Sequence, residues 1–282
     1  MTDYFEVLER DGAARLAELR LTEAVTTPAL VDEHVDDAGS LWRAERELPD
    51  GDESRLTVLP HRGLPAGTAD EVADSFAVDY PSVDYPSAAV VSADTAADHG
   101  ADAYVVSDAG GSLGHGAGMK DLVLAVRDAI PDDTGLYLSG VATPRNVAVL
   151  AYAGVDLFDA HRAYVRGTEG RYLTTDDAYF LEDLDELPCA CPACAKPREE
   201  FDREDCAAHN VNALEAELRR VRRRIRDGRL RDYIEGQARQ DQWLTALMRE
   251  LDQQYSYLEE RTPVYRGADL DAATEDTIRR AE

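Results

Sequence analysis

LYLSGVATP at residues 136–144 and GVDLFD at residues 154–159 form the stretch from which the fold is predicted. Each segment contains a short apolar run, at residues 136–138 and 155–158, of the length expected for a buried strand. Between these runs, Thr143 and Pro144 are residue types that favour the cap and the first position of a helix, and the sequence up to Ala153 has helix length. The order strand, helix, strand predicts two parallel strands joined by a helical crossover.

The same alternation is found earlier in the chain. Short apolar runs lie at residues 56–59, 88–92 and 103–106, and an amphipathic segment of helix length lies at residues 120–130. Alternating strands and helices predict a parallel sheet of βα units, in which ligand sites lie at the carboxyl ends of the strands. The acidic residues 32–54 instead predict a loop with at most a short helix.

The amino-terminal part has the pattern of a β-hairpin. FEVLER at residues 5–10 and AELRL at residues 17–21 have alternating faces, and the turn dipeptide Asp11-Gly12 follows the first of them. TPALV at residues 27–31 then predicts the start of an apolar strand.

Three of the four cysteines lie in CACPAC at residues 189–194, and a histidine follows at position 209. Three thiolates and one imidazole are a complete tetrahedral ligand set for zinc, and four protein ligands leave no open position for a catalytic water. We therefore predict a structural zinc site with the ligands Cys189, Cys191, Cys194 and His209. Buried apolar cysteines or a redox pair are the alternative interpretation. Cys206 is either a buried helix residue or the fourth ligand in place of His209.

The charge composition is extreme for a protein of 282 residues. The formal net charge is −27 at pH 7, and only Lys120 and Lys196 among the 30 basic residues are lysines. Molar salt screens charges beyond about 3 Å, so this composition indicates adaptation to a high-salt cytoplasm rather than to a cationic partner. No signal peptide or apolar run of membrane-span length is found, and metal-bound thiols fit a reducing compartment. We expect a cytoplasmic protein that does not bind membranes.

Residues 207–257 have a purely helical pattern and contain the one basic region of this acidic chain, eight arginines between positions 219 and 231. One interpretation is a solvated helix whose arginines pair with Glu215, Glu217, Asp227 and Asp232. The other is phosphate binding, because the planar arginine fork matches a phosphate group. The candidate residues for phosphate binding are Arg219, Arg222, Arg223 and Arg226. The tail from residue 263 has little apolar periodicity.

Four motifs, in this order, resemble the archaeal tRNA-guanine transglycosylase superfamily. They are the hairpin with DGAAR at 11–15 and TPA at 27–29, YLSGVATP at 137–144, GVDLFD at 154–159, and the cysteine cluster leading to His209 and Asn210. Four ordered motifs are more specific than any one of them. The resemblance covers about residues 1–266 and is strongest to the archaeosine synthase branch, which acts on 7-cyano-7-deazaguanine after this base has entered the D-arm of tRNA.

The resemblance assigns a role to Asp159. In the transglycosylases, the aspartate that ends the matching motif attacks the ribose anomeric carbon and forms a covalent glycosyl intermediate, so Asp159 is the candidate nucleophile. Its other interpretation is a helix cap after a strand. Asp156 would lie on the opposite face of a regular strand, so we interpret it as structural.

Two features of the superfamily are not found in these 282 residues. Nothing reproduces the Asp-Ser-Gly-Gly-Tyr/Phe-Gln segment that supplies the general acid/base and holds the base. SDAGG at residues 107–111 is similar in composition but differs from it in residue order and position. The synthase signature Pro-Cys-x3-Lys-Pro-Tyr-x2-Ser-x2-His and a following PUA domain are also missing. We therefore expect either the amino-terminal part of a longer protein or a split subunit with a separately encoded catalytic partner.

Together these observations predict an α/β fold. We expect a contracted TIM-barrel-like transglycosylase domain at residues 1–185, a zinc-binding and helical subdomain at 186–262, and a linker or flexible tail at 263–282. The expected function is tRNA modification in archaeosine biosynthesis. The alternatives are an active tRNA-guanine transglycosylase that uses Asp159, with a second acid for which Asp108 is a candidate, and a non-catalytic tRNA-binding subunit.

The resemblance also implies partners. They are tRNA, a radical-SAM enzyme that finishes the conversion, a separately encoded catalytic or PUA subunit, and a second copy of the chain, because superfamily members often dimerise through the zinc subdomain.

Overall fold

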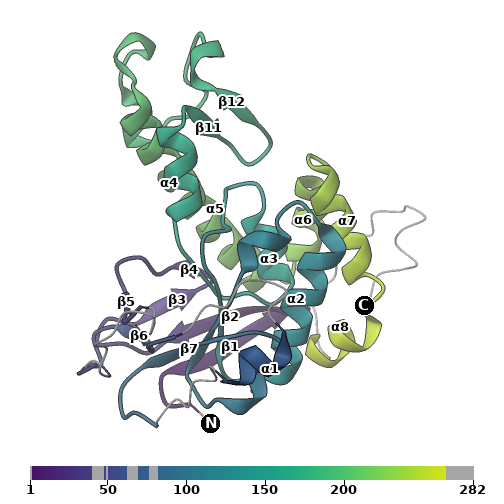
Figure 1. Ribbon diagram of the computed structural model, residues 1–282. Helices are drawn as coiled ribbons and strands as arrows, with labels where there is room; N and C mark the ends of the chain where they lie inside the picture. Colours follow the sequence, from purple (N-terminus) through teal and green to yellow (C-terminus); the bar gives the residue numbers. More distant parts are fainter. Residues whose placement is uncertain (1, 40–47, 49, 62–68, 76–81, 265–282) are drawn as a thin grey trace.

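The computed structural model describes residues 2–39, 48, 50–61, 69–75 and 82–264, and it has an α/β architecture (Figure 1). Its main element is a seven-stranded sheet in which every neighbouring pair is parallel. In order across the sheet, the strands are β4 (Ala29–Leu30), β10 (Leu157–Phe158), β9 (Gly135–Leu138), β8 (Ala103–Val106), β7 (Ser87–Val91), β6 (Leu56–Val58) and β5 (Val35–Asp37). The predicted parallel sheet is confirmed.

The two edge strands of this sheet follow one another directly in the sequence. β4 ends at Leu30 and β5 begins at Val35, and a chain of that length spans at most about 18 Å. In a flat sheet, seven strands spaced by about 4.8 Å would separate the two edges by about 29 Å. The sheet must therefore curl, and it forms a half-barrel with fewer strands than a complete TIM barrel. This confirms the predicted contracted barrel.

A separate antiparallel sheet covers the amino-terminal ends of the barrel strands. It consists of β1 (Phe5–Asp11), β2 (Ala14–Leu19) and β3 (Val25–Thr27). Phe5 and Leu19 share a hydrophobic cluster with Ala103, at the start of β8. The predicted hairpin is thus confirmed, with Gly12 in the left-handed region of its turn at φ 61°.

The outer face of the barrel is covered by helices. Leu136 and Leu138 of β9 belong to a large cluster that also contains Val123, Val149 and Leu244 from three different helices. The helices are α1 (Asp70–Ser75), α2 (Gly116–Ala129), α3 (Val147–Tyr152), α4 (His161–Thr168), α5 (Arg203–Arg226), α6 (Leu230–Ala238), α7 (Gln242–Leu251) and α8 (Tyr255–Arg261). Short 3-10 helices lie at Ala96–Asp98, Ala109–Ser112, Leu181–Asp183, Pro192–Ala195 and Arg198–Glu200. No helix of the described residues has the length and apolar character needed to cross a membrane.

An arm extends away from the barrel strands (Figure 1). It contains α4, the antiparallel pair β11 (Arg171–Leu173) and β12 (Ala178–Phe180), and the amino-terminal part of α5. Tyr172, Phe201 and Cys206 form its small core. We refer to residues 161–209 as the arm.

Several predicted boundaries differ from the structure. The run at residues 27–31 is divided at Pro28, which follows a cis peptide bond, into strands of two different sheets. The region predicted as a loop contains β5, a short strand whose last two residues are exposed acids, so no apolar alternation marked it. Residues 40–47 and 49 of that region, and 265–282 of the predicted tail, lie outside the described residues.

The predicted helical boundaries also shift. α3 begins at Val147 rather than at Thr143, and the backbone N–H of Thr143 donates to the side chain of Asn146 at 2.8 Å. The long helical region is four helices, because Gly228, at φ 62°, ends α5, and the side chain of Asp241 caps α7.

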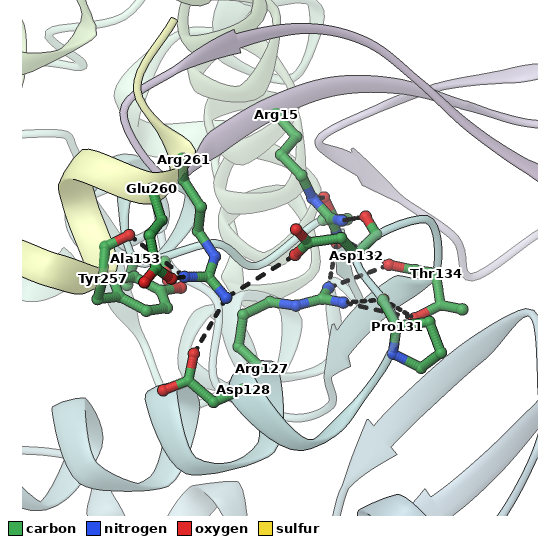
Figure 2. A network of polar contacts seen from close by, with 11 residues as sticks. Arg15, Arg127, Asp128, Pro131, Asp132, Thr134, Ala153, Tyr257, Glu260 and Arg261 are labelled. Atoms are coloured by element: carbon green, nitrogen blue, oxygen red, sulfur yellow. Dashed lines mark hydrogen bonds and ion pairs between the residues drawn. The ribbon is translucent and has the colours of Figure 1, made fainter.

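A buried polar network joins the hairpin sheet to the barrel. The guanidinium of Arg15 on β2 forms a bidentate ion pair with Asp156, with Nε donating to Oδ1 at 3.0 Å, and both side chains are about 1% exposed. Asp156 also accepts from the backbone N–H of Leu136 at 2.8 Å. Figure 2 shows how Arg15 and Arg127 converge on the backbone around Thr134, where they donate to its carbonyl at 2.8 and 3.0 Å. Asp156 is therefore a structural residue, as predicted.

Candidate functional site

The four predicted metal ligands come from two elements of the arm. Cys189, Cys191 and Cys194 lie in and beside the short turn Pro192–Ala195, and His209 lies in the second turn of α5. α5 begins with a capping box, in which the side chain of Asp202 accepts from two backbone N–H groups while Asp205 bonds back to Asp202. This cap fixes where the helix begins and thus which face His209 occupies.

The ligand atoms of these four residues all lie within 4.8 Å of one another. Nδ1 of His209 is 3.5 Å from Sγ of Cys191 and 3.3 Å from Sγ of Cys194, and the two sulfurs are 3.6 Å apart. A tetrahedral ion with bonds of about 2.3 Å to sulfur and about 2.0 Å to nitrogen separates its ligand atoms by about 3.5–3.8 Å. The cluster therefore has the size and donor set to hold a metal ion.

The residues around the cluster place His209 in a form that could bind a metal ion. Its Nε2 donates to the carbonyl of Leu173 at 2.9 Å, which leaves the lone pair of Nδ1 directed at the thiols. Burial lowers the pKa of His209, so the neutral form that binds metals is favoured. The ring of Tyr172 stacks on the imidazole at 3.7 Å, and its hydroxyl lies 3.3 Å from Sγ of Cys194.

Cys206 is not part of this cluster. Its thiol is fully buried in the hydrophobic core of the arm, together with Tyr172 and Phe201. Burial raises the pKa of this thiol to about 11. Among the two interpretations of Cys206, the structure therefore favours the buried helix residue.

Asp159 lies at the carboxyl end of β10, where the barrel opens. Its carboxylate accepts three hydrogen bonds, from the hydroxyl of Tyr137 at 3.0 Å, the backbone N–H of Gly140 at 2.8 Å and the backbone N–H of His161 at 3.1 Å. The residue is only 6% exposed. The N-cap of α4 is Ala160, so Asp159 lies one residue before the cap position and its bond to the N–H of His161 ties the end of β10 to the first residue of the helix.

A second carboxylate at this opening was not identified from the sequence. Asp32 follows β4, and its two carboxylate oxygens accept from the backbone N–H of Ala160 at 3.1 and 3.0 Å. Burial raises the pKa of Asp32, and the charge of Asp159 contributes to this rise. The available signal was its position directly after a strand of the sheet, where the carboxyl ends of parallel strands meet. Asp108, the candidate suggested from the sequence, is exposed in the turn after β8, with φ 55°.

The arginines of α5 have different environments. Arg219 pairs with Glu215 at 2.7 Å and Arg223 with Asp227 at 3.0 Å, and both are more than two-thirds exposed. Arg222 donates to the carbonyl of Pro28. Arg226 forms no ion pair with another described residue. Several of the ion pairs expected for a solvated helix are thus present, and they leave the exposed guanidiniums available on the surface.

Comparison with known proteins shows extended similarity. The family model of queuine tRNA-ribosyltransferase (TGT) matches residues 84–242. An archaeosine synthase of Haloferax volcanii is 67% identical over the entire chain, which corresponds to 48% of that relative, and archaeosine synthase subunit alpha of Methanosarcina acetivorans is 36% identical, with 50% of its length covered. A tRNA-guanine(15) transglycosylase of Haloferax volcanii is 34% identical over 57% of the chain and 33% of its own length.

The chain thus spans about half the length of the archaeosine synthases that it matches. The family model covers more than half of the chain and includes the last four barrel strands of the sequence, Asp159 and the cysteine cluster. The chain belongs to the TGT family of queuine tRNA-ribosyltransferases.

Proposed function

We propose that this chain is the transglycosylase-like part of an archaeosine synthase and that it binds tRNA whose D-arm carries 7-cyano-7-deazaguanine. The observation that carries the proposal is the 67% identity to the Haloferax volcanii archaeosine synthase, which extends over all 282 residues. The composition agrees with this relative, since a net charge of −27 suits a protein of a high-salt cytoplasm.

The metal in the arm is proposed to be zinc in a structural role. Cys189, Cys191, Cys194 and His209 supply the donor set that zinc prefers, and their separations fit a tetrahedral ion. Four protein ligands fill that coordination sphere, so the ion would hold the turn Pro192–Ala195 against α5 and would take no part in the chemistry. The arm would then present a fixed surface next to the barrel opening.

The chain is proposed not to exchange bases. Hydrogen bonds from Tyr137, Gly140 and His161 stabilise the charge of the Asp159 carboxylate and fix its position, which weakens it as a nucleophile. The sequence also has no counterpart of the segment that holds the base in the transglycosylases. Asp159 then acts as a positioning residue, which ties the start of α4 to the loop after β9.

The alternative is an active transglycosylase with Asp159 as the nucleophile, and one observation favours it. Asp32 and Asp159 lie at the same barrel opening, and burial together with their mutual repulsion raises the pKa of Asp32. A carboxylate and a neighbouring carboxyl group of raised pKa are an arrangement that can divide nucleophile and acid/base roles.

The full enzyme would also need partners. The name of the Methanosarcina acetivorans relative, subunit alpha, supports a separately encoded subunit, and the resemblance supports a radical-SAM enzyme.

Binding of tRNA is tested by charge reversal on α5. We expect the Arg223→Glu/Arg226→Glu protein to bind unmodified tRNA several-fold more weakly than the unchanged chain, because both guanidiniums are exposed and would contact phosphates. Arg222 is left unchanged because its bond to Pro28 is structural. The measurement is a filter-binding titration over a series of KCl concentrations.

The matched control is Arg20→Glu/Arg55→Glu, which makes the same charge change at two exposed arginines that flank β2 and β6, each in one ion pair. If both variants lost the same affinity for tRNA, the loss would be due to the change in net charge and not to contacts made by α5. No binding of tRNA by the unchanged chain would contradict the proposed function.

A further inference from the structure

We propose that a pocket between the barrel and the arm, lined by Arg145, Arg162, Arg166 and Arg171, binds a phosphodiester group of RNA. The cavity has a volume of about 350 Å³. The inference rests on the proposed function, in that it assumes a tRNA ligand, and it names a contact region separate from the arginines of α5.

The pocket lies where three parts of the molecule meet. Arg145 comes from the loop between β9 and α3, Arg162 and Arg166 are one turn apart on α4, and Arg171 is the first residue of β11. Trp243, at the start of α7, is also part of the lining. Arg145 lies in the loop that follows the carboxyl end of β9, so one side of the pocket is formed at the end of the barrel where Asp159 lies.

The arginines of the pocket are only partly neutralised by acids. Both aspartates of the lining contact the same arginine: Asp177 lies 3.2 Å and Asp241 3.4 Å from the guanidinium of Arg145. Arg166 pairs with Glu169 at 2.9 Å. Four cations and two anions therefore line the cavity, which leaves an excess of positive charge in a strongly acidic chain.

Two of the four guanidiniums have no acidic partner. The side chain of Arg162 forms no hydrogen bond or ion pair with the described residues, although it is half-buried. Arg171 is held by stacking, with its guanidinium carbon 3.9 Å from the centre of the Phe180 ring, and no described acid pairs with it. Burial lowers the pKa of Arg162 and the charge of Arg166 lowers it further, while the charge of Glu169 offsets part of this shift. An anion between these side chains would relieve the repulsion.

The chemistry of the lining fits a nucleotide unit of RNA. Two arginine forks that face one cavity can hold the oxygens of a phosphate group in bidentate contacts. Trp243, partly buried against the core, contributes an aromatic ring to the same lining, and stacking on an aromatic ring is the usual way in which proteins hold an unpaired base. A phosphate next to an aromatic surface is therefore better matched by an RNA chain than by a free phosphate ion.

The test uses the fluorescence of Trp243. The chain has two tryptophans, and a Trp42→Phe parent protein leaves Trp243 as the only one. We expect unmodified tRNA to change the emission of this zinc-loaded parent. Arg162→Gln/Arg166→Gln in the same background should bind at least tenfold more weakly, and the slope of log K against log salt should fall by about 1.4 to 1.8, as for two lost phosphate contacts.

The control is Arg20→Gln/Arg55→Gln, which removes two positive charges from exposed arginines that flank β2 and β6 and should leave affinity and slope unchanged. Melting temperature and zinc content are compared for all variants. If the double variant is unstable, Arg162→Gln alone replaces it, since this side chain has no partner among the described residues.

The possible outcomes separate the two proposals. Unchanged affinity and slope in the arginine variant, with tRNA still bound by the parent, would overturn the pocket assignment and leave the proposed function intact. An unchanged emission of Trp243 on tRNA binding would also overturn it. A parent that binds no tRNA would contradict both.

Discussion

The Cys191→Ser protein should be recovered without bound zinc and should be less stable by several kcal/mol, because a structural metal site contributes its binding free energy to folding. Cys191 is central to the cluster, with its sulfur 3.6 Å from that of Cys194 and 3.5 Å from Nδ1 of His209. Without the ion, the turn Pro192–Ala195 would be held to α5 by apolar packing and the ion pair between Lys196 and Asp205 alone. Zinc content is measured by elemental analysis and stability by chemical unfolding.

Cys206→Ser is the matched control for this change. It makes the same substitution three residues before His209, at a thiol that is buried but outside the cluster, so zinc should remain near one equivalent. Full zinc occupancy in the Cys191→Ser protein would rule out the assigned ligand set. Loss of zinc in the Cys206→Ser protein, with retention in His209→Ala, would identify Cys206 as the fourth ligand.

The second large effect is expected at the ion pair between the hairpin sheet and the barrel. Asp156→Ala should lower the free energy of unfolding by about 3–5 kcal/mol, because the charge of Arg15 would remain buried without its partner. Burial and the neighbouring Arg15 already lower the pKa of Arg127, so the loss of the nearby carboxylate leaves two guanidiniums uncompensated. Equilibrium unfolding in guanidinium chloride measures the difference.

Glu6→Ala is the control, since it breaks an ion pair of the same kind with Arg20 on the exposed side of the same hairpin. That change should cost less than about 1 kcal/mol. Similar losses in the two proteins would show that the pair between Arg15 and Asp156 has no special structural role. Replacing both members by leucine should restore part of the stability lost in Asp156→Ala, because no buried charge is left over.

The features that the sequence predicts well are those with local signals. The cluster of Cys189, Cys191, Cys194 and His209 that could hold a metal ion is recognisable because three of its members lie within residues 189–194 and only the histidine must come from elsewhere. The strands β8 and β9 are short apolar runs of the expected length. Asp156 and Asp159 point to opposite faces because the side-chain period of a strand is two.

The features that were missed depend on tertiary structure. Arg222 bonds to the carbonyl of Pro28, 194 residues away, and no pattern along α5 distinguishes it from its exposed neighbours. The residues that line the pocket of four arginines come from a loop, two elements of the arm and the start of α7, which lie far apart in the sequence. Asp32 is one of many acidic residues in its region, so the sequence does not distinguish it from the others. The pairing of β4 with β10 brings its carboxylate to the backbone N–H of Ala160.

Incorporation of radiolabelled guanine into unmodified tRNA is the assay that separates a tRNA-binding, transglycosylase-like subunit from an active transglycosylase. The zinc-loaded chain is incubated with tRNA and guanine at a KCl concentration at which binding is detected. We expect binding without incorporation above background, because the carboxylate of Asp159 is held by three donors and the base-holding segment is missing. Incorporation by the unchanged chain that is lost in Asp159→Ala would contradict this and would establish base exchange with Asp159 as the nucleophile.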